Sequence, residues 1–266
     1  KIKNPLIRRI PKELIGDWKK YLVVFLFLVL TIGFVSGMYV ANESMITSAN
    51  EGVTKYKQED GHFELKKQAD ATLLSAIETG EKADFKATKT TLYENFFRNE
   101  EEDYNNDGKK DGTIRVFAKT KDINLACMLQ GSFPQKADEI AIDRMHADNV
   151  GIKVGDTVTV SGETYKVVGL LAYVNYSTLH EKTTDLMFDA LKFDVAMVTQ
   201  DGFDRLHKSI HYTYAWKYET EPADEAGEKT RSDNFMRALL TQVVVADNEL
   251  EDYTPKYGNP AINFAT

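Results

Sequence analysis

The sequence has little cysteine and lacks the motifs of common enzymes. Its 266 residues include one cysteine, Cys127, so no disulfide can form within the chain. A domain of this size needs no disulfide, so the count is compatible with a location outside the cell. The sequence has no G-x-x-x-x-G-K-[ST], which excludes ATP binding by a P-loop, and no G-x-S-x-G or H-E-x-x-H. We therefore expect no enzyme, no catalytic residue and no cofactor.

Charge is absent from one stretch and unevenly distributed over the rest. Residues 1–20 carry seven Lys or Arg and two Asp or Glu, residues 21–40 carry no charge, and the remainder carries 26 basic and 39 acidic residues. The acidic remainder would repel phosphate, which argues against nucleic acid as a partner. A basic start, an apolar segment and an acidic body are typical of a membrane protein with a cytosolic N-terminus and an extracytoplasmic main domain.

The uncharged segment predicts a transmembrane helix over residues 21–40. Twenty residues form a helix of about 30 Å, which matches the hydrocarbon core of a bilayer. The segment is longer than the apolar region of a signal peptide, roughly 7–15 residues, and it has no polar stripe like that of a helix on a soluble core. Trp18 and Tyr21 at one end and Tyr39 at the other suit the two membrane interfaces.

The segments on either side of this helix differ in character. Residues 1–20 form a basic cytosolic segment in which Ile7, Ile10, Leu14 and Trp18 recur at helical spacing. It is either an amphipathic helix in the inner headgroup layer or a basic flank that only sets orientation. Residues 41–60 have a helical composition and predict a stalk that continues the span, and residues 61–266 form the extracytoplasmic domain.

Strand and helix patterns alternate in residues 61–266, so the fold class is α+β. Alternation and turn residues predict strands at 61–65, 86–97, 113–120, 139–142, 157–160, 164–168, 193–199 and 211–218. Helices are expected at 66–79, 144–150, 200–208 and 225–245, the last with Phe235, Leu239 and Leu240 on one face. Residues 98–112 are expected to form a polar loop. Asp143 is the predicted cap of the helix that Gly151 ends, and Ser161-Gly162 joins a hairpin.

One stretch resembles a known family. Residues 131–171, GSFPQKADEIAIDRMHADNVGIKVGDTVTV followed by YKVVGLL, resemble the extracytoplasmic core domain of FtsX-like, MacB-type ABC transporter permeases. The residues that carry the resemblance are Gly131, Pro134, Asp138, Glu139, Ile140, Gly151, Gly155, Asp156, Val167, Val168 and Gly169. They are turn and cap residues, so they indicate the family and mark no functional site.

The resemblance implies a non-catalytic permease subunit that pairs with a separate cytosolic ATP-binding subunit and with a second permease copy or a homologous permease. Such a subunit either exports lipids, peptides or antibiotics or transmits motion to its outer domain. The family places three further spans after this domain, so we expect the chain to be the amino-terminal part of a longer subunit. The alternative is a single-span surface receptor or adhesion protein whose outer domain binds a ligand.

A calcium loop is the sharpest metal pattern in the sequence. Asp103, Asn105, Asp107 and Asp111 occupy positions 1, 3, 5 and 9 of such a loop, with Gly108 at position 6. Position 12 is Ile114, where a bidentate glutamate belongs. The alternative is a solvated loop rich in turn-forming residues.

Other chemically suggestive residues are better explained by structure. His207 and His211 lie four residues apart, but no third ligand is near and the segment looks extended, so we expect no zinc site there. Cys127 is expected to be a small buried hydrophobic residue. A cluster of aromatic residues either lines a groove or packs between strands: Tyr173, Tyr176, Tyr212, Tyr214 and Trp216. The sequence therefore assigns no metal ligand and no binding residue.

Overall fold

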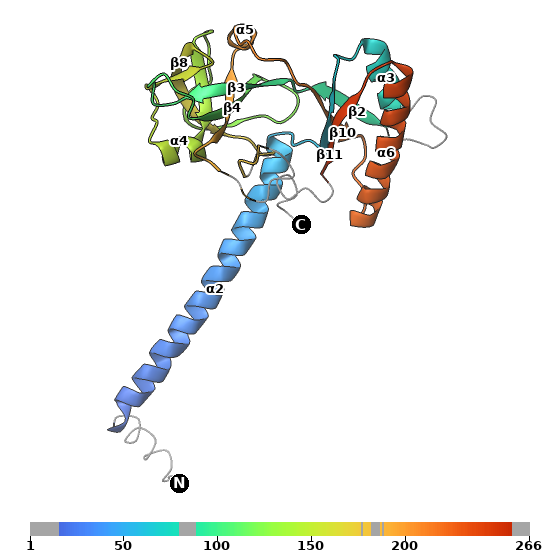
Figure 1. Cartoon of the computed structure of the whole chain (residues 1–266). Helices are drawn as coiled ribbons and strands as arrows, with labels where there is room; N and C mark the ends of the chain where they lie inside the picture. The colour runs from blue at the N-terminus through green and yellow to red at the C-terminus, as the bar shows by residue number, and fades with distance from the viewer. Residues whose placement is uncertain (1–15, 80–88, 177, 182–186, 188, 257–266) are drawn as a thin grey trace. The chain divides into compact units, whose positions relative to one another are not determined.

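The computed structural model of the chain describes residues 16–79, 89–176, 178–181, 187 and 189–256 (Figure 1). Contacts divide the chain into two units, Lys1–Glu51 and Gly52–Thr266. Most of the basic segment expected over residues 1–20, including Ile7, Ile10 and Leu14, lies outside the described residues. Its placement as a surface helix or as a simple flank stays a prediction.

A single long helix, α2 (Trp18–Lys55), contains the apolar segment. Its part Trp18–Ala41 has a mean hydropathy of 2.4 and no buried residue, and it is long enough to cross a membrane. The span predicted over residues 21–40 falls within it. The helix ends at Lys55, because Lys57 adopts a left-handed conformation with φ 50°. The helical stalk expected to reach residue 60 is therefore five residues shorter.

Six strands of the second unit close into a barrel. They are β3 (Phe97–Asp103), β4 (Gly112–Ala118), β6 (Glu139–Asp143), β7 (Thr157–Val160), β8 (Glu163–Ala172) and β9 (Phe193–Val198). The order around the barrel is β8-β6-β9-β4-β3-β7, and β7 pairs with β8 to complete it. A further strand, β5 (Cys127–Gly131), extends the sheet from β8. A Cβ on Gly131 would lie 2.2 Å from the Val168 carbonyl oxygen, which explains this glycine of the family-like motif.

Alternate residues of these strands fill the barrel. Ile140 and Ile142 join the interior, whereas Ala141 between them packs against the outer cluster. Helix α4 (Arg144–Val150) packs on the interior through Ala147, and its backbone N–H groups at Met145 and His146 donate to the Asp143 side chain. The short helix α5 (Gln200–Asp204) contributes Phe203 to the same core.

A second sheet carries two helices on one face (Figure 1). Its antiparallel order is β11 (Leu250–Pro255), β1 (Gly61–Leu65), β10 (Tyr212–Tyr218) and β2 (Thr90–Glu94). Helices α3 (Ala71–Thr79) and α6 (Glu225–Val245) complete a core with it. The largest members of this core are Phe63, Leu65, Ile77, Tyr214, Trp216, Phe235 and Leu239. Leu240, expected beside Phe235 and Leu239, is instead 39% exposed.

The α+β class is confirmed, as are the strands and helix between residues 139 and 172. The loop expected over residues 98–112 is wrong in its first half, because Phe97–Asp103 is strand β3. The helix expected from residue 66 begins at Ala71, since Asp70 accepts the Leu73 N–H at 2.8 Å and caps it. The helix expected over 200–208 ends at Asp204, and strands β5 and β11 were not expected.

Gly61 is the position where the second sheet tolerates no side chain. A Cβ there would lie 2.3 Å from the Trp216 ring and 2.8 Å from the Thr254 carbonyl oxygen. We expect Gly61→Ala to lower the free energy of unfolding by about 1–3 kcal/mol, because the buried indole must move. Urea denaturation of the detergent-solubilised chain, followed by tryptophan fluorescence, measures this. The control is Gly52→Ala, whose Cβ meets nothing within 4 Å, and equal destabilisation by both changes would contradict the prediction.

Candidate functional site

The chain passes from α2 into the outer domain through three consecutive buried polar residues. Gln58, Glu59 and Asp60 are 2%, 1% and 2% exposed. Buried polar groups require hydrogen-bond partners, and buried carboxylates require them most. We call residues 56–60 the junction segment. Its partners show which parts of the domain it holds.

On one side, the junction segment is bonded to the residues that lead into β5. The backbone N–H of Asn124 donates to the Lys57 carbonyl at 3.0 Å, and that of Leu125 donates to the Tyr56 carbonyl at 2.8 Å. The Asn124 side chain donates to Glu59 Oε2 at 2.6 Å and accepts the Glu59 N–H at 3.1 Å. This side of the segment is thereby fixed to the barrel sheet, which β5 extends.

On the other side, Asp60 is bonded to the four-stranded sheet. Its carboxylate accepts from the Lys217 ammonium and from the Tyr218 N–H, both at 2.8 Å. Its own N–H donates to the Trp216 carbonyl at 2.9 Å, and its carbonyl accepts the Lys256 N–H at 2.9 Å. Lys256 directly follows β11 (Leu250–Pro255), so the residue before β1 and the residue after β11 are joined by a hydrogen bond.

Electrostatics stabilise the ionised forms of Glu59 and His62. Glu59 Oε1 and His62 Nδ1 are 2.6 Å apart. Burial opposes ionisation of both groups. The His62 charge and the hydrogen bonds of His62 and Asn124 nevertheless lower the pKa of Glu59, and the Glu59 charge raises the pKa of His62. For Asp60, burial outweighs the nearby Lys217 ammonium and raises the pKa of the carboxyl group.

A cleft of about 390 Å³ lies next to the junction segment, between the polar face of the four-stranded sheet and the outer face of the barrel. Arg115 of β4 extends into it, 4.3 Å from the Phe97 ring centre. Its guanidinium donates to Asn99 Oδ1, the Tyr176 hydroxyl and the Glu181 carbonyl, each at 3.0 Å. Three of its five N–H donors are thus used, and two of them hold Tyr176 and Glu181 against the barrel.

His211 belongs to this cleft. Its Nδ1 lies 2.6 Å from Glu64 Oε1, and its ring stacks on Phe97 at 4.5 Å between centres. His207 is exposed and lies beyond the end of α5. The structure therefore supports the expectation that His207 and His211 lie on no common helix.

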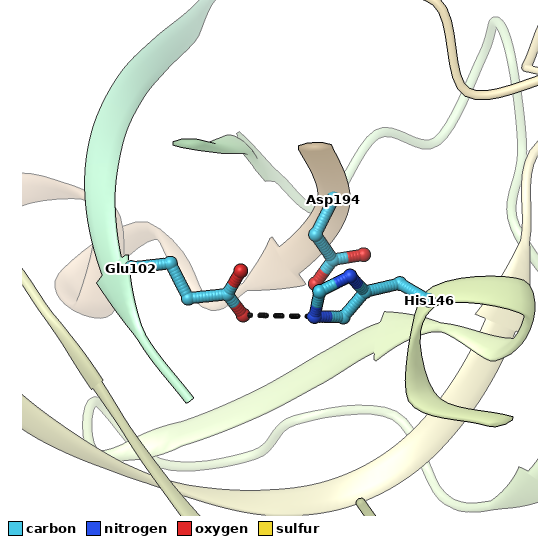
Figure 2. A group of neighbouring side chains, drawn as sticks. All are labelled: Glu102, His146 and Asp194. Carbon is cyan, nitrogen blue, oxygen red and sulfur yellow. Dashed lines mark ion pairs between the residues drawn. The ribbon is translucent and has the colours of Figure 1, made fainter. Parts of the chain in front are cut away.

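A buried trio of polar side chains lies under α4 (Figure 2). Glu102 comes from β3, His146 from α4 and Asp194 from β9, and all three are fully buried. Three of their side-chain atoms, one from each residue, lie within 4.8 Å of one another. Figure 2 shows one imidazole nitrogen facing the Glu102 carboxyl group and the Asp194 carboxyl group close to the ring. His146 Nε2 lies 3.4 Å from Glu102 Oε1. It is the one such group of three among the residues that the structure describes.

Burial and charge shift the titration of the trio strongly. Burial raises the pKa of Asp194 well above its ordinary value. Burial lowers the pKa of His146, but the charges of Asp194 and Glu102 and the Ala190 carbonyl outweigh it and raise that pKa to about 9. The protonation of His146 and that of Asp194 thus depend on each other and on the Glu102 charge.

In the loop that resembles a calcium site, carboxylate oxygens accept hydrogen bonds from the loop's own backbone. Asp103 accepts the backbone N–H groups of Asp107 and Gly108 at 3.0 and 2.8 Å. Asp111 accepts the Tyr104 N–H at 3.2 Å. Ile114, at the twelfth position, is fully buried in the barrel core and offers no ligand. These contacts match the turn-rich loop that was the alternative to calcium.

The remaining sequence candidates are packing residues. Tyr214 and Trp216 lie in the core of the four-stranded sheet, and Tyr173 packs on the outer face of the barrel. Tyr176 packs there too and also lines the cleft. Cys127 is half-buried and not fully buried as expected, and its Sγ accepts the Tyr56 hydroxyl at 2.8 Å. This hydrogen bond connects β5 to the junction segment.

Neither the buried junction segment nor the trio was predicted from the sequence. Glu59 and Asp60 were placed in a helical stalk, and Glu102 was placed in a loop. The one local signal was Asp194, a single acidic residue in the apolar strand FDVAMV, where an inward carboxylate needs a partner. The strand register shows that this carboxylate points inward, because Asp194 lies beside Ile114 of the barrel interior.

Comparisons with solved structures find similar chains among transporter domains. The extracellular domain of the noncanonic ABC-type transporter YknZ from Gram-positive bacteria is 14% identical, with a TM-score of 0.36, over 73% of this chain and 98% of that domain. The periplasmic region of MacB from Actinobacillus actinomycetemcomitans is 9% identical, with a TM-score of 0.37, over 77% of this chain and 94% of that one. No protein-family model and no curated protein matches the chain.

These matches are to the class of protein that the sequence resemblance named. With identities below 15% and TM-scores below 0.5, they transfer no residue role to this chain and carry no conclusion about its function. The contacts of the junction segment and the exposed apolar helix are properties of this chain itself.

Asp60 allows a direct test of the junction segment. Asp60→Ala leaves the Lys217 ammonium and the Tyr218 N–H without their acceptor, and we expect it to lower the free energy of unfolding by about 2–3 kcal/mol. Urea denaturation measures the loss. The matched control is Glu249→Ala, which breaks an ion pair of similar length, 2.7 Å to Lys66, whose side chains are 51% and 69% exposed. The control should change stability far less, because its ion pair is exposed to solvent, and an equal effect of both changes would refute the assignment.

The Glu59–His62 pair predicts a pH dependence. The raised pKa of His62 contributes stability that is present below about pH 6.5 and is lost as pH rises through the raised value. The lowered pKa of Glu59 contributes stability that is present above about pH 4.5 and is lost as pH falls through the lowered value. The stability difference between the native chain and His62→Gln should therefore be largest between these limits. A difference that is flat with pH would contradict the pairing.

Proposed function

We propose that the chain is a non-catalytic permease subunit of an ABC-type exporter or mechanotransmission complex. In this function, α2 crosses the membrane, and motion driven by a separate cytosolic ATP-binding subunit reaches the extracytoplasmic domain through the junction segment. A second permease copy completes the complex. The N-terminus lies in the cytosol and the acidic domain lies outside, as the basic residues 1–20 favour.

The observation that carries this proposal is the continuity of an exposed apolar helix with a buried polar segment. Trp18–Ala41 buries no residue within the structure, so it needs another apolar environment, which a bilayer supplies. The same helix runs to Lys55 without a break, and the next five residues are bonded to Asn124 on one side and to β10 on the other. An anchor alone would need no such buried connection.

A second supporting observation is that the first residue of β1 and the last residue of β11 lie side by side. Gly61 of β1 pairs with Pro255 of β11, and Lys256 donates its N–H to the Asp60 carbonyl. The segment that precedes β1 and the segment that follows β11 are therefore attached to neighbouring strand ends. This arrangement suits a domain inserted between membrane helices, as in the family that residues 131–171 resemble.

Co-purification tests the proposal. The full-length gene product, expressed with its neighbouring genes and captured in detergent, should bring down a protein with a P-loop. If no ATP-binding protein associates, the permease assignment fails and the single-span receptor or adhesion protein takes its place. Protease treatment of intact cells should remove the domain and leave residues 1–20 protected, and the reverse pattern would overturn the orientation.

Hydrogen exchange tests the transmission step. In the captured complex, trapping the ATP-bound state should change exchange at the amides of Glu59 and Asp60, which are bonded to Asn124 and Trp216. Asp60→Ala should weaken this response without releasing the ATP-binding protein, whereas Glu249→Ala should keep it. If nucleotide alters exchange nowhere in the outer domain, no motion is transmitted.

A further inference from the structure

The buried trio has an excess of hydrogen-bond acceptors. His146 Nδ1 lies 2.7 Å from the Ala190 carbonyl oxygen, which can only accept, so Nδ1 carries the proton. In the neutral form of the imidazole, Nε2 would then present a lone pair toward Glu102. Four trio atoms are buried and make no hydrogen bond: Glu102 Oε1, Glu102 Oε2, His146 Nε2 and Asp194 Oδ2.

Protons alone satisfy this group poorly. An imidazolium at His146 and a protonated Asp194 would offer two donors for the two Glu102 oxygens, but neither Glu102 oxygen makes a hydrogen bond in the structure. Each unpaired buried polar atom costs about 1–3 kcal/mol, and a buried carboxylate costs more. A divalent cation satisfies all the lone pairs together and neutralises the two carboxylates. The composition of the trio thus points to a metal ion.

The surrounding contacts orient the side chains as metal ligands are oriented. Asp194 turns one oxygen, Oδ1, to the backbone N–H groups of Asp143 and Val195 at 3.2 and 2.7 Å, and its other oxygen stays free. His146 is held through Nδ1 by the Ala190 carbonyl, which leaves Nε2 as the ligating atom. Ligating histidines and carboxylates are commonly positioned by such outer hydrogen bonds.

We propose that Glu102, His146 and Asp194 bind one divalent transition-metal ion, Zn²⁺ by ligand chemistry, inside the barrel under α4. Two ligands at about 2.0–2.1 Å from a tetrahedral Zn²⁺ lie about 3.3–3.4 Å apart, and His146 Nε2 and Glu102 Oε1 are 3.4 Å apart. The imidazole favours zinc over calcium or magnesium. The second oxygen of Glu102, also unpaired, is suited to the fourth position. The site joins β3, α4 and β9, so its role is structural and is independent of any ATP-binding partner.

Metal content tests this proposal. The full chain is purified in detergent with a tag that contains no histidine, loaded with ZnCl₂ and passed through gel filtration, and zinc is measured by mass spectrometry. We expect about one zinc per chain, and about 100-fold weaker binding in His146→Gln. The control His207→Gln removes an exposed imidazole and should keep the zinc. Absence of zinc from the native chain, or equal retention in His146→Gln, would overturn the site.

Asp194→Asn separates the metal site from a metal-free hydrogen-bonded trio. The asparagine oxygen can still accept the two backbone N–H groups, and its amide nitrogen adds a donor toward the other trio atoms. In a metal-free trio this change raises the melting temperature. At a metal site it abolishes zinc binding and removes the fall in melting temperature that a chelator causes in the native chain. A chelator that leaves the melting temperature of the native chain unchanged would also refute the proposal.

Discussion

The connection between helix and domain rests on the burial of Glu59 and Asp60. Removing a carboxylate from water costs several kcal/mol, which only well-placed partners offset. Glu59 has Asn124 and His62, and Asp60 has Lys217 and the Tyr218 N–H. Because Asn124 leads into the barrel sheet while Lys217 and Tyr218 belong to the other sheet, two adjacent residues fix both sheets to one peptide unit. Apolar residues there would also be buried, but they would not select these particular partners.

The barrel shows the same principle at a second place. Its interior is aliphatic at most inward positions, as at Ile114, Ile140 and Ile142. Under α4, the inward positions of β3 and β9 carry Glu102 and Asp194 instead. Hydrocarbon at these positions would avoid the desolvation of two carboxylates. A cation bound by all three side chains would offset the cost of burying the two carboxylates beside this imidazole. Without a cation, buried acceptor atoms stay unpaired.

Local chemistry made part of the fold predictable. The hairpin of β7 and β8 follows from Ser161-Gly162, whose φ values of 47° and 88° suit a two-residue turn, and Asp143 caps α4 as its position predicts. Strand β3 was not predictable, because Glu100 is held by Ser161 and by the Lys208 N–H, both distant in sequence. The helix predicted over the junction segment was wrong for the same reason. Hydrogen bonds to residues more than 60 positions away outweigh its helical composition. Sites made of such long-range polar contacts leave no periodic pattern.

The position of β1 in its sheet bears on how a displacement of α2 would act in the proposed function. β1 is bonded along its length to β10 on one side and β11 on the other. A shift at Asp60 is therefore shared by three strands, and the sheet with its packed helices moves as a body more readily than it deforms. The cleft beside the junction segment is lined by charged groups such as Glu64 and Asp252 and also by the rings of Phe97 and Phe117. The backbone hydrogen bonds between Phe97 and His211 connect its two sides. In the proposed function, the Asn124–Glu59 contact would carry a displacement at the junction segment to the barrel sheet as well.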